Sequence, residues 1–207
     1  MAPLRFLQAN INHCAAAQDL LLQSMAQWLI NVAVVAEPYF VVPRNDWVAD
    51  LNGSVTLISS AAAGTPLLDL VKRGRGIVAA RFGEIAVVGV YFSPNRTLAE
   101  FQDSLSELGD VVVDFGSLPV LVLGDFNAKN VAWGSRYTDH MRGRMLENWA
   151  LAQGLVIENR GSVPTCVRWR GESVVDVTFA SSNISPRVTD WRVVEEVETY
   201  SDHRYPV

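Results

Sequence analysis

Short apolar segments that end at a polar side chain recur along this chain of 207 residues. The clearest is the segment 121–123, which runs directly into Gly124-Asp125-Phe126-Asn127. Other polar residues at or within such segments are Asn10, Glu37, Tyr91 and Asp176. A segment that is apolar throughout predicts a strand covered on both faces. The chain must therefore fold so that several strands lie between other layers, with polar groups at the strand ends.

Hydrophobic periodicity predicts many strands and about three helices. We expect helices at 15–30, from the capping box Thr97-Leu98-Ala99-Glu100 towards Asp114, and at 145–153. We expect strands at 4–10, 32–36, 55–58, 77–80, 85–91, 119–123, 155–158, 166–169, 174–178 and 188–194. Strand pairs without a helix between them exclude a simple doubly wound sheet. The pattern favours a mixed α+β fold in which two sheets pack together with helices outside.

The composition fits one globular domain that spans 1–207. Hydrophobic residues make up 49% and charged residues 19%, which excludes a disordered chain. No segment reaches about 18 uncharged apolar residues, and the N-terminus lacks the zones of a signal peptide, so we expect no membrane partner. The spacing of Cys14 and Cys166 indicates neither a disulfide framework nor a zinc site. Two reduced thiols are typical of the cytosol or nucleus.

The charge balance leaves nucleic-acid binding open. The net charge of −5 argues against a uniformly basic binder, but carboxylates in a metal-binding cleft lower the total without excluding local contacts. Lys72 and Lys129 are the two lysines, so 15 of the 17 basic residues are arginines (17 − 2). Arginine holds phosphate bidentately and stacks on bases. GC-rich codon usage accounts for the same bias equally well.

The polar strand ends suit metal-assisted hydrolysis of a phosphodiester. That reaction needs the charge on the phosphate neutralised, a water made nucleophilic and the leaving oxygen stabilised. Proteins typically hold Mg²⁺ through one or two carboxylates together with water and substrate phosphate, and Mn²⁺ is a possible substitute. We expect Glu37 to be the main ligand. Asn10 and Asp202 are expected to complete or border the metal site.

The remaining catalytic roles need an imidazole and its partners. His203 is the candidate, acting as a base or as a positive charge beside the phosphate, and Asp176 is the candidate acceptor for its other ring nitrogen. Asp125 and Asn127 are expected to orient water and hold a phosphate oxygen, and Tyr91 to donate its hydroxyl to the phosphate. The other histidines have plainer interpretations: His13 as a cap or surface residue, and His140 as a solvated residue unless its loop touches DNA.

These residues, in this order and approximate spacing, resemble the endonuclease/exonuclease/phosphatase superfamily, which includes deoxyribonuclease I. The resemblance rests on Asn10, Glu37, Tyr91, Gly124-Asp125-Phe126-Asn127, Asp176 and Ser201-Asp202-His203. It extends over nearly the entire chain. It implies a DNase I-like four-layer α/β/β/α sandwich. It also implies the roles given above, with Glu37 and Asp202 at the metal and Asp176 bonded to the catalytic His203.

Finer motifs are similar to the endonuclease domain of insect non-LTR (LINE) retrotransposons of the R1/TRAS-like clade. They are 7–10, Glu37-Pro38-Tyr39, Trp133-Gly134-Ser135, Gly143-Arg144 and 175–181. This resemblance implies Mg²⁺-dependent nicking of double-stranded target DNA, which leaves a 3′-hydroxyl that primes reverse transcription. It also implies a reverse transcriptase in the same polyprotein, from which this chain would be an excised domain. Synthesis in the cytoplasm and action in the nucleus would follow.

A predicted hairpin before Asp176 is the candidate DNA reader. Arg168 and Arg170 flank Trp169 at its tip, and Thr165, directly before its first strand, is a further candidate for DNA binding. Arginine can read groove shape and charge, and tryptophan can wedge or stack. In the alternative interpretation Trp169 faces the core and both arginines are merely solvated. Further candidates, for contacts to the DNA backbone, are Arg73, Arg75, Arg136, Arg142 and Arg144.

Two other functions stay open at this point. One is a phosphatase of the same superfamily that acts on a soluble or lipid phosphate, although such an enzyme has less use for an Arg-Trp-Arg hairpin. The other is a catalytically inactive DNA-binding module, against which stands the presence of every expected catalytic residue.

Overall fold

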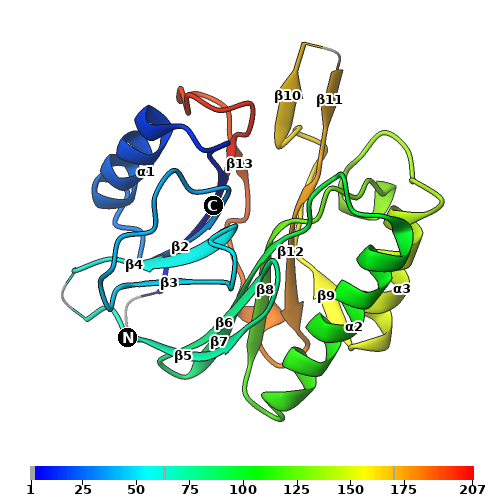
Figure 1. Cartoon of the computed structure of the whole chain (residues 1–207), viewed down its shortest axis with the longest axis horizontal. Coiled ribbons are helices and arrows are strands. Elements are labelled where there is room, and N and C mark those ends of the chain that lie inside the picture. Colours follow the sequence, from blue (N-terminus) through cyan, green and yellow to red (C-terminus); the bar gives the residue numbers. More distant parts are fainter. Residues whose placement is uncertain (1–2, 63, 170) are drawn as a thin grey trace.

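The computed structural model describes residues 3–62, 64–169 and 171–207 and consists of four layers. Two β-sheets pack face to face, one α-helix lies outside the first sheet, and two lie outside the second (Figure 1). This is the predicted α/β/β/α sandwich. The three interfaces between the four layers are filled by three apolar cores.

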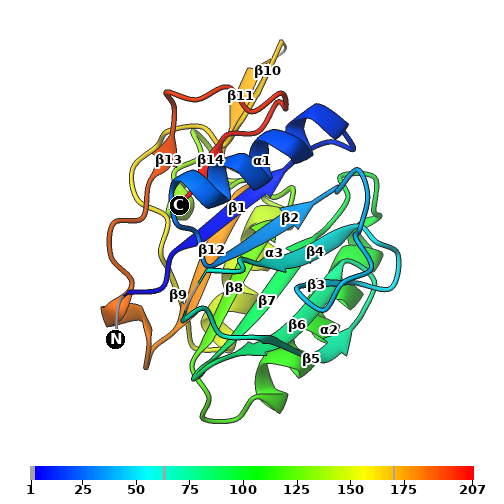
Figure 2. The ribbon, with the colours of Figure 1, turned by 90° about the vertical axis from the view of Figure 1, so that its left-hand side faces the viewer.

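The first sheet has the order β1-β2-β4-β3, with β1 Phe6–Asn10, β2 Val32–Ala36, β3 Trp47–Ala49 and β4 Val55–Ser59. β1 and β2 are parallel, which requires a crossover, and α1 (Ala15–Gln27) supplies it. Leu21 and Met25 of α1 are buried in one core with β1 and β2. Figure 2 looks onto this sheet with α1 in front of β1.

The second sheet has the order β5-β6-β7-β8-β12-β9. Its strands are β5 Leu68–Arg73, β6 Ile77–Phe82, β7 Ile85–Tyr91, β8 Val120–Asp125, β9 Leu155–Ile157 and β12 Asp176–Ser181. Only β7 and β8 pair in parallel among these strands, through the crossover helix α2 (Leu98–Asp114). Thr97 and Glu100 form the predicted capping box. Helix α3 (Arg142–Ala152) packs beside α2.

Smaller elements join the body. β10 (Cys166–Arg168) and β11 (Gly171–Ser173) form a two-stranded hairpin that projects from the sandwich (Figure 1). β13 (Val193–Val194) pairs with β14 (Tyr205–Pro206), which lies beside β1. Two short 3₁₀ helices occupy Val131–Trp133 and Ser185–Arg187. No helix in the described part of the chain is long and apolar enough to cross a membrane.

The structure corrects several predicted elements. β3 and β5 were not expected, because β3 is short and five of the six residues of β5 are exposed, which hides the apolar signal of this edge strand. The strand expected at 174–178 is β12, which begins at Asp176 and runs on to Ser181. The strand expected at 188–194 is confined to Val193–Val194. Helix α3 begins at Arg142, three residues earlier than predicted.

Candidate active site

Polar side chains from both sheets meet at one end of the sandwich. Asn10 at the end of β1 donates from Nδ2 to Glu37 Oε2 at 2.9 Å and to Asp125 Oδ2 at 3.0 Å. Tyr91 at the end of β7 donates its hydroxyl to Glu37 Oε1 at 2.7 Å. Asn10 therefore bridges two carboxylates: that of Glu37, which follows β2 of the first sheet, and that of Asp125, which ends β8 of the second sheet. These residues, predicted separately, form one network.

The network forms the wall of a cleft of about 210 Å³. Predicted site residues along this cleft are Asn10, Glu37, Tyr91, Asp125, Asn127 and Arg168. Ser93, Pro94 and Asn95, from the loop after β7, line it as well. No motif predicted a role for this loop, which is brought to the cleft by the parallel pairing of β7 with β8.

Gly124 explains why Asp125 can lie at this place. A Cβ on Gly124 would come within 1.9 Å of the Val90 carbonyl oxygen on the neighbouring β7. Glycine is the residue that permits this close approach of two backbones. In the next strand of the sheet, Asp176 pairs in register with Asp125. The sheet therefore places two buried carboxylates side by side.

His203 lies among three carboxylates. Its side chain is buried, and Nδ1 is 2.9 Å from Asp176 Oδ2. Nε2 is 4.0 Å from Asp125 Oδ2 and 3.9 Å from Asp202 Oδ1. The predicted pair of His203 with Asp176 is thus formed in the structure. The second ring nitrogen faces the side of the site where Asp125 lies.

The surroundings shift the pKa values of the buried groups. Burial, and then the charge of Asp176, raises the pKa of Asp125 to about 7. Burial lowers the pKa of His203, but the charge and hydrogen bond of Asp176 outweigh it and carry that pKa well above its usual range. Burial and the hydrogen bond to Glu37 raise the pKa of Tyr91. The site thus combines a positively charged imidazole, a neutral phenol donor and a carboxyl able to exchange a proton near neutral pH.

Two site residues have left-handed backbone conformations. Glu37 has φ 49° and Asn127 has φ 46°. Such values are uncommon for residues other than glycine, and they cluster at functional sites where the fold imposes them. The Glu37 backbone is fixed on both sides, with its N–H donating to Ser54 O and its carbonyl accepting from His13 N. Asn127 is held by its own N–H, which donates to Asp125 Oδ1, and by Nδ2, which donates to Phe92 O.

The donor set fits a hard divalent cation. Glu37 and Asp125 contribute carboxylate oxygens to the cleft, and oxygen donors of this kind suit Mg²⁺ and Mn²⁺. Asp202 Oδ1 is buried and has no hydrogen-bond partner among the described residues, whereas Oδ2 pairs with Arg168. The side-chain oxygen of Asn10 is already hydrogen-bonded, because Oδ1 accepts from Asn12 N. Asn10 therefore orients Glu37 more than it offers a free oxygen.

His13 is a surface residue, as one of its two interpretations predicted, but it also contacts the site. Its Nδ1 lies 3.0 Å from Pro38 O, and its Nε2 lies 3.7 Å from Glu37 Oε1, although the side chain stays mostly exposed. Ser201 also holds the site, since its hydroxyl donates to Asn10 O at 2.7 Å. Both contacts join segments far apart in the sequence, so no local pattern predicted them.

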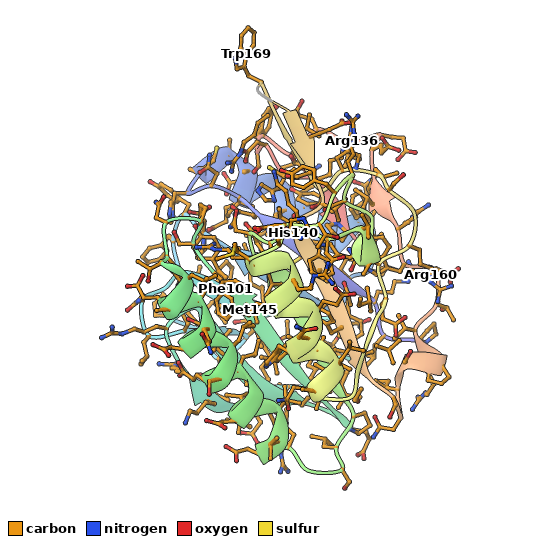
Figure 3. The ribbon with its side chains drawn as sticks, turned by 90° about the vertical axis from the view of Figure 1, so that its right-hand side faces the viewer. Phe101, Arg136, His140, Met145, Arg160 and Trp169 are labelled. Atoms are coloured by element: carbon orange, nitrogen blue, oxygen red, sulfur yellow. The ribbon has the colours of Figure 1, made fainter. Side chains whose placement is uncertain are left out.

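The hairpin places its tryptophan in solvent. Trp169 is 97% exposed and points away from the body of the molecule, so the interpretation of a core-facing side chain is wrong (Figure 3). Arg168 forms an ion pair with Asp202 and reaches the cleft. Arg136 pairs with Glu172 of β11 at 2.7 Å. The prediction for Arg170 falls outside the described residues.

Two other DNA-contact predictions need correction. Thr165 is fully buried, and its Oγ1 accepts from the N–H groups of Val175 and Asp176 at 3.1 and 3.2 Å, so it anchors the hairpin and cannot touch DNA directly. Arg142 is turned inward: it donates to the carbonyls of Ser93 and Pro94 at 3.2 Å and lies over the Phe101 ring.

Arg73 and Arg75 remain exposed on either side of the turn between β5 and β6. The carbonyl of Arg75 accepts from Arg96 at 2.9 Å. The β6 strand that follows pairs Ile77 with Val90, next to Tyr91. The turn therefore lies at the same end of the second sheet as the cleft, where both arginines keep their predicted role as candidates for DNA-backbone contacts.

Comparison with known proteins gives concordant matches. A family model described as endonuclease-reverse transcriptase matches residues 85–207. The solved endonuclease domain of TRAS1, a telomere-specific non-LTR retrotransposon, is 30% identical with a TM-score of 0.82, covering 99% of this chain and 96% of that one. No curated protein matches the sequence.

More distant structures share the fold. A 3′-5′ exonuclease from Neisseria meningitidis is 16% identical with a TM-score of 0.71, covering 97% of each chain. An AP endonuclease from Archaeoglobus fulgidus is 14% identical with a TM-score of 0.72, covering 99% of this chain and 98% of that one. At these identities the likeness concerns the fold alone.

Proposed function

Because this chain belongs to the endonuclease-reverse transcriptase family and is a DNase I-like endonuclease domain of the non-LTR retrotransposon type, we propose that it nicks double-stranded target DNA in a Mg²⁺-dependent reaction. The nick leaves a 3′-hydroxyl that primes reverse transcription of the element RNA. The enzyme is joined to a reverse transcriptase in the longer polyprotein, is made in the cytoplasm and acts in the nucleus.

One observation carries this proposal. The buried His203–Asp176 pair lies against Asp125, and Asp125 shares its cleft with Glu37 and Tyr91. Together these residues can supply what phosphodiester hydrolysis requires. The requirements are a binding place for a cation, a group that accepts a proton from the attacking water, and hydrogen-bond donors that stabilise charge on the phosphate.

In the proposed reaction each residue has one task. Asp125 accepts a proton from the attacking water, while Asn127 holds the water or a phosphate oxygen. The new P–O bond forms as the P–O3′ bond breaks, and the 3′ oxygen leaves and takes up a proton from solvent water, while Asp125 later returns its proton to solvent. Tyr91 and the His203 imidazolium donate hydrogen bonds to phosphate oxygens, and Asp176 keeps the imidazole oriented.

Glu37 would hold the metal, with Asp202 bordering it through its unpaired oxygen. When bound, Mg²⁺ supplies positive charge that neutralises the phosphate. Tyr91 and Asn10 each donate to one oxygen of Glu37, which fixes the orientation of that carboxylate before any ligand arrives.

The test is conversion of supercoiled plasmid to open circles. We expect nicking with Mg²⁺ or Mn²⁺ and none with excess chelator, and extension of the nick by a DNA polymerase without end repair would establish the 3′-hydroxyl. The matched control is Glu37→Gln, which keeps the side-chain shape and removes the charge. Absence of open circles from a folded wild-type protein at any divalent metal would refute the proposal.

A further inference from the structure

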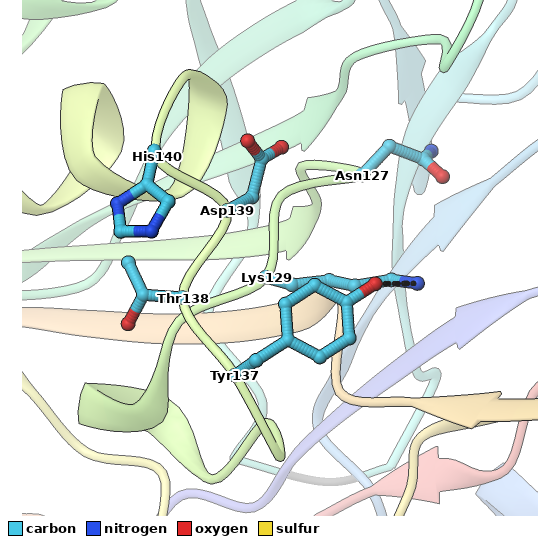
Figure 4. A pocket seen from close by; sticks show the side chains of 6 residues that line it. All are labelled: Asn127, Lys129, Tyr137, Thr138, Asp139 and His140. Carbon is cyan, nitrogen blue, oxygen red and sulfur yellow. Dashed lines mark hydrogen bonds between the residues drawn. The ribbon is translucent and has the colours of Figure 1, made fainter.

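A second pocket adjoins the catalytic cleft, beyond Asn127. It is an open depression of about 550 Å³ lined by Asn127, Lys129, Tyr137, Thr138, Asp139 and His140 (Figure 4). Asn127 lines the cleft as well. A DNA strand whose phosphate lies in the cleft therefore has a neighbouring nucleotide within reach of this pocket. The volume lies in the range of sites that hold one small ligand.

The pocket has an aromatic wall that is held in place. Tyr137 is 57% exposed, yet Lys129 Nζ lies 5.4 Å from its ring centroid and donates to its hydroxyl at 3.2 Å. The remaining ring surface is open to a ligand. An aromatic side chain beside an ammonium group suits a nucleotide, because a base has a π-face and its phosphate is an anion.

The loop under the pocket is held in place by several hydrogen bonds. Asn130 is buried and its side chain contacts Gly143 O, Glu147 Oε2 and Thr138 Oγ1. Asp139 N–H donates to Lys129 O at 2.8 Å. A Cβ on Gly143 would lie 1.9 Å from Lys129 O, so only glycine lets α3 approach this loop so closely. A preformed pocket loses little conformational entropy when it binds a ligand.

The same loop also reaches the hairpin. Next to Tyr137, Arg136 pairs with Glu172 of β11, and the Ser135 hydroxyl donates to Val174 O at 2.9 Å. One continuous segment therefore connects the cleft at Asn127, the pocket, and the base of the projecting hairpin. DNA that spans the cleft and the hairpin would pass over this segment.

We propose that this pocket is a subsite for one nucleotide of the target DNA, next to the scissile phosphate, whose base packs against the Tyr137 ring. This inference rests on the proposed function and deepens it. Tyr137 acts as a binding residue and Lys129 holds its ring, while the hydrolytic groups stay in the cleft. The subsite adds a contact to the nicked region that is separate from the contacts of the hairpin.

The test uses synthetic duplexes with a mapped nick site. An abasic residue replaces each nucleotide around the nick in turn, and kcat/KM is measured for wild type and for Tyr137→Ala. For wild type we expect a loss of about tenfold at one position, which corresponds to the stacking of one base. Tyr137→Ala should lose about as much on intact DNA and then be insensitive to the abasic residue at that position.

Two control variants separate this contact from a structural effect. Tyr137→Phe keeps the ring but loses the hydroxyl that accepts from Lys129, so it should lose less kcat/KM than Tyr137→Ala and stay sensitive to the abasic residue at that position. Val131→Ala removes a side chain of similar exposure (60%) that does not line the pocket, and it should respond to each abasic residue as wild type does. Melting curves by circular dichroism are expected to coincide for all variants, since both positions are exposed.

The outcomes are distinct from those that test the proposed function. A wild-type enzyme that nicks no duplex refutes the proposed function. Two other results would overturn the subsite proposal alone. In the first, the wild-type enzyme nicks DNA but is insensitive to every abasic residue. In the second, Tyr137→Ala is as sensitive to the abasic residue at the critical position as wild type is.

Discussion

The catalytic centre and the β10–β11 hairpin touch each other but are held in opposite ways. In the centre, His203 and Asp176 are buried and hydrogen-bonded, and the strand that carries Asp176 is paired on both sides within the second sheet. The hairpin has only three residue pairs and ends in a fully solvated Trp169.

The junction between the two regions is small and specific. Arg168 pairs with Asp202, and Cys166 forms a β-bridge with His203. The fold thus fixes the groups that need accurate geometry and gives the hairpin tip, which is proposed to contact DNA, few contacts with the body of the molecule. A substitution in the centre should change chemistry or folding, whereas one at the tip should change binding.

The largest expected effect is that of His203→Ala. Nicking should fall about a thousandfold or more, because the variant removes both the positive charge beside the phosphate and a hydrogen-bond donor to the phosphate oxygens. Plasmid nicking under single-turnover conditions measures the loss, and a melting curve checks that the variant folds. Activity within tenfold of wild type would show that the imidazole is not part of the reaction.

Gly124→Ala tests how tightly the strands of the centre are packed. The new Cβ would meet the Val90 carbonyl, so we expect a loss of about 3 kcal/mol in the free energy of unfolding, measured with urea. Gly116→Ala is the matched control: its φ is also positive, at 60°, but no atom lies within 4 Å of the added Cβ. It should lose only about 1 kcal/mol. Equal losses would mean that β7 and β8 can separate easily.

Thr165→Val tests the base of the hairpin. It conserves shape but removes the hydroxyl that accepts from Val175 N and Asp176 N, so we expect a loss of about 2 kcal/mol in the free energy of unfolding. Affinity for DNA should not change in an equilibrium binding measurement without divalent metal. If the affinity for DNA fell while the free energy of unfolding stayed unchanged, Thr165 would contact DNA after all.

Trp169→Ala should leave the free energy of unfolding within about 0.5 kcal/mol of wild type, because the side chain is almost entirely exposed to solvent. We expect kcat/KM for nicking to fall about tenfold, mainly through a higher KM, because an exposed aromatic can stack on or wedge into DNA. Trp169→Phe should recover part of the loss. If Trp169→Ala nicks the same sites at the same rate as wild type, the hairpin tip does not contact the target.

The sequence was sufficient for features that depend on neighbouring residues. The capping box of Thr97 and Glu100 formed as predicted, and apolar runs marked the central strands. It missed β5, whose exposed residues carry no apolar pattern. It also placed the start of β12 two residues early, because Val174 and Val175 are apolar and buried without belonging to the strand.

For the site, residue identity and order were enough to nominate His203, Asp176, Asp125 and Glu37. The pair of His203 with Asp176 was predicted from their chemical roles. The bridge that Asn10 makes between Glu37 and Asp125 was not, because Asn10 and Asp125 lie more than a hundred residues apart in the sequence. The same limit explains why the DNA-contact predictions for Thr165 and Arg142 were wrong. Both side chains can bind DNA, but in the folded protein they form hydrogen bonds with backbone groups of the protein itself.

By itself, then, the sequence determined the layered fold, the family and the chemical types at the site, because apolar periodicity and motif order are properties of the chain. The tertiary structure alone decided how those groups share their partners. It raised the pKa of Asp125 by burying it beside Asp176, joined Arg168 to Asp202, and built the Tyr137 pocket on a loop with no motif of its own. Burial and charge pairing depend on distances in space, and those exist only after folding.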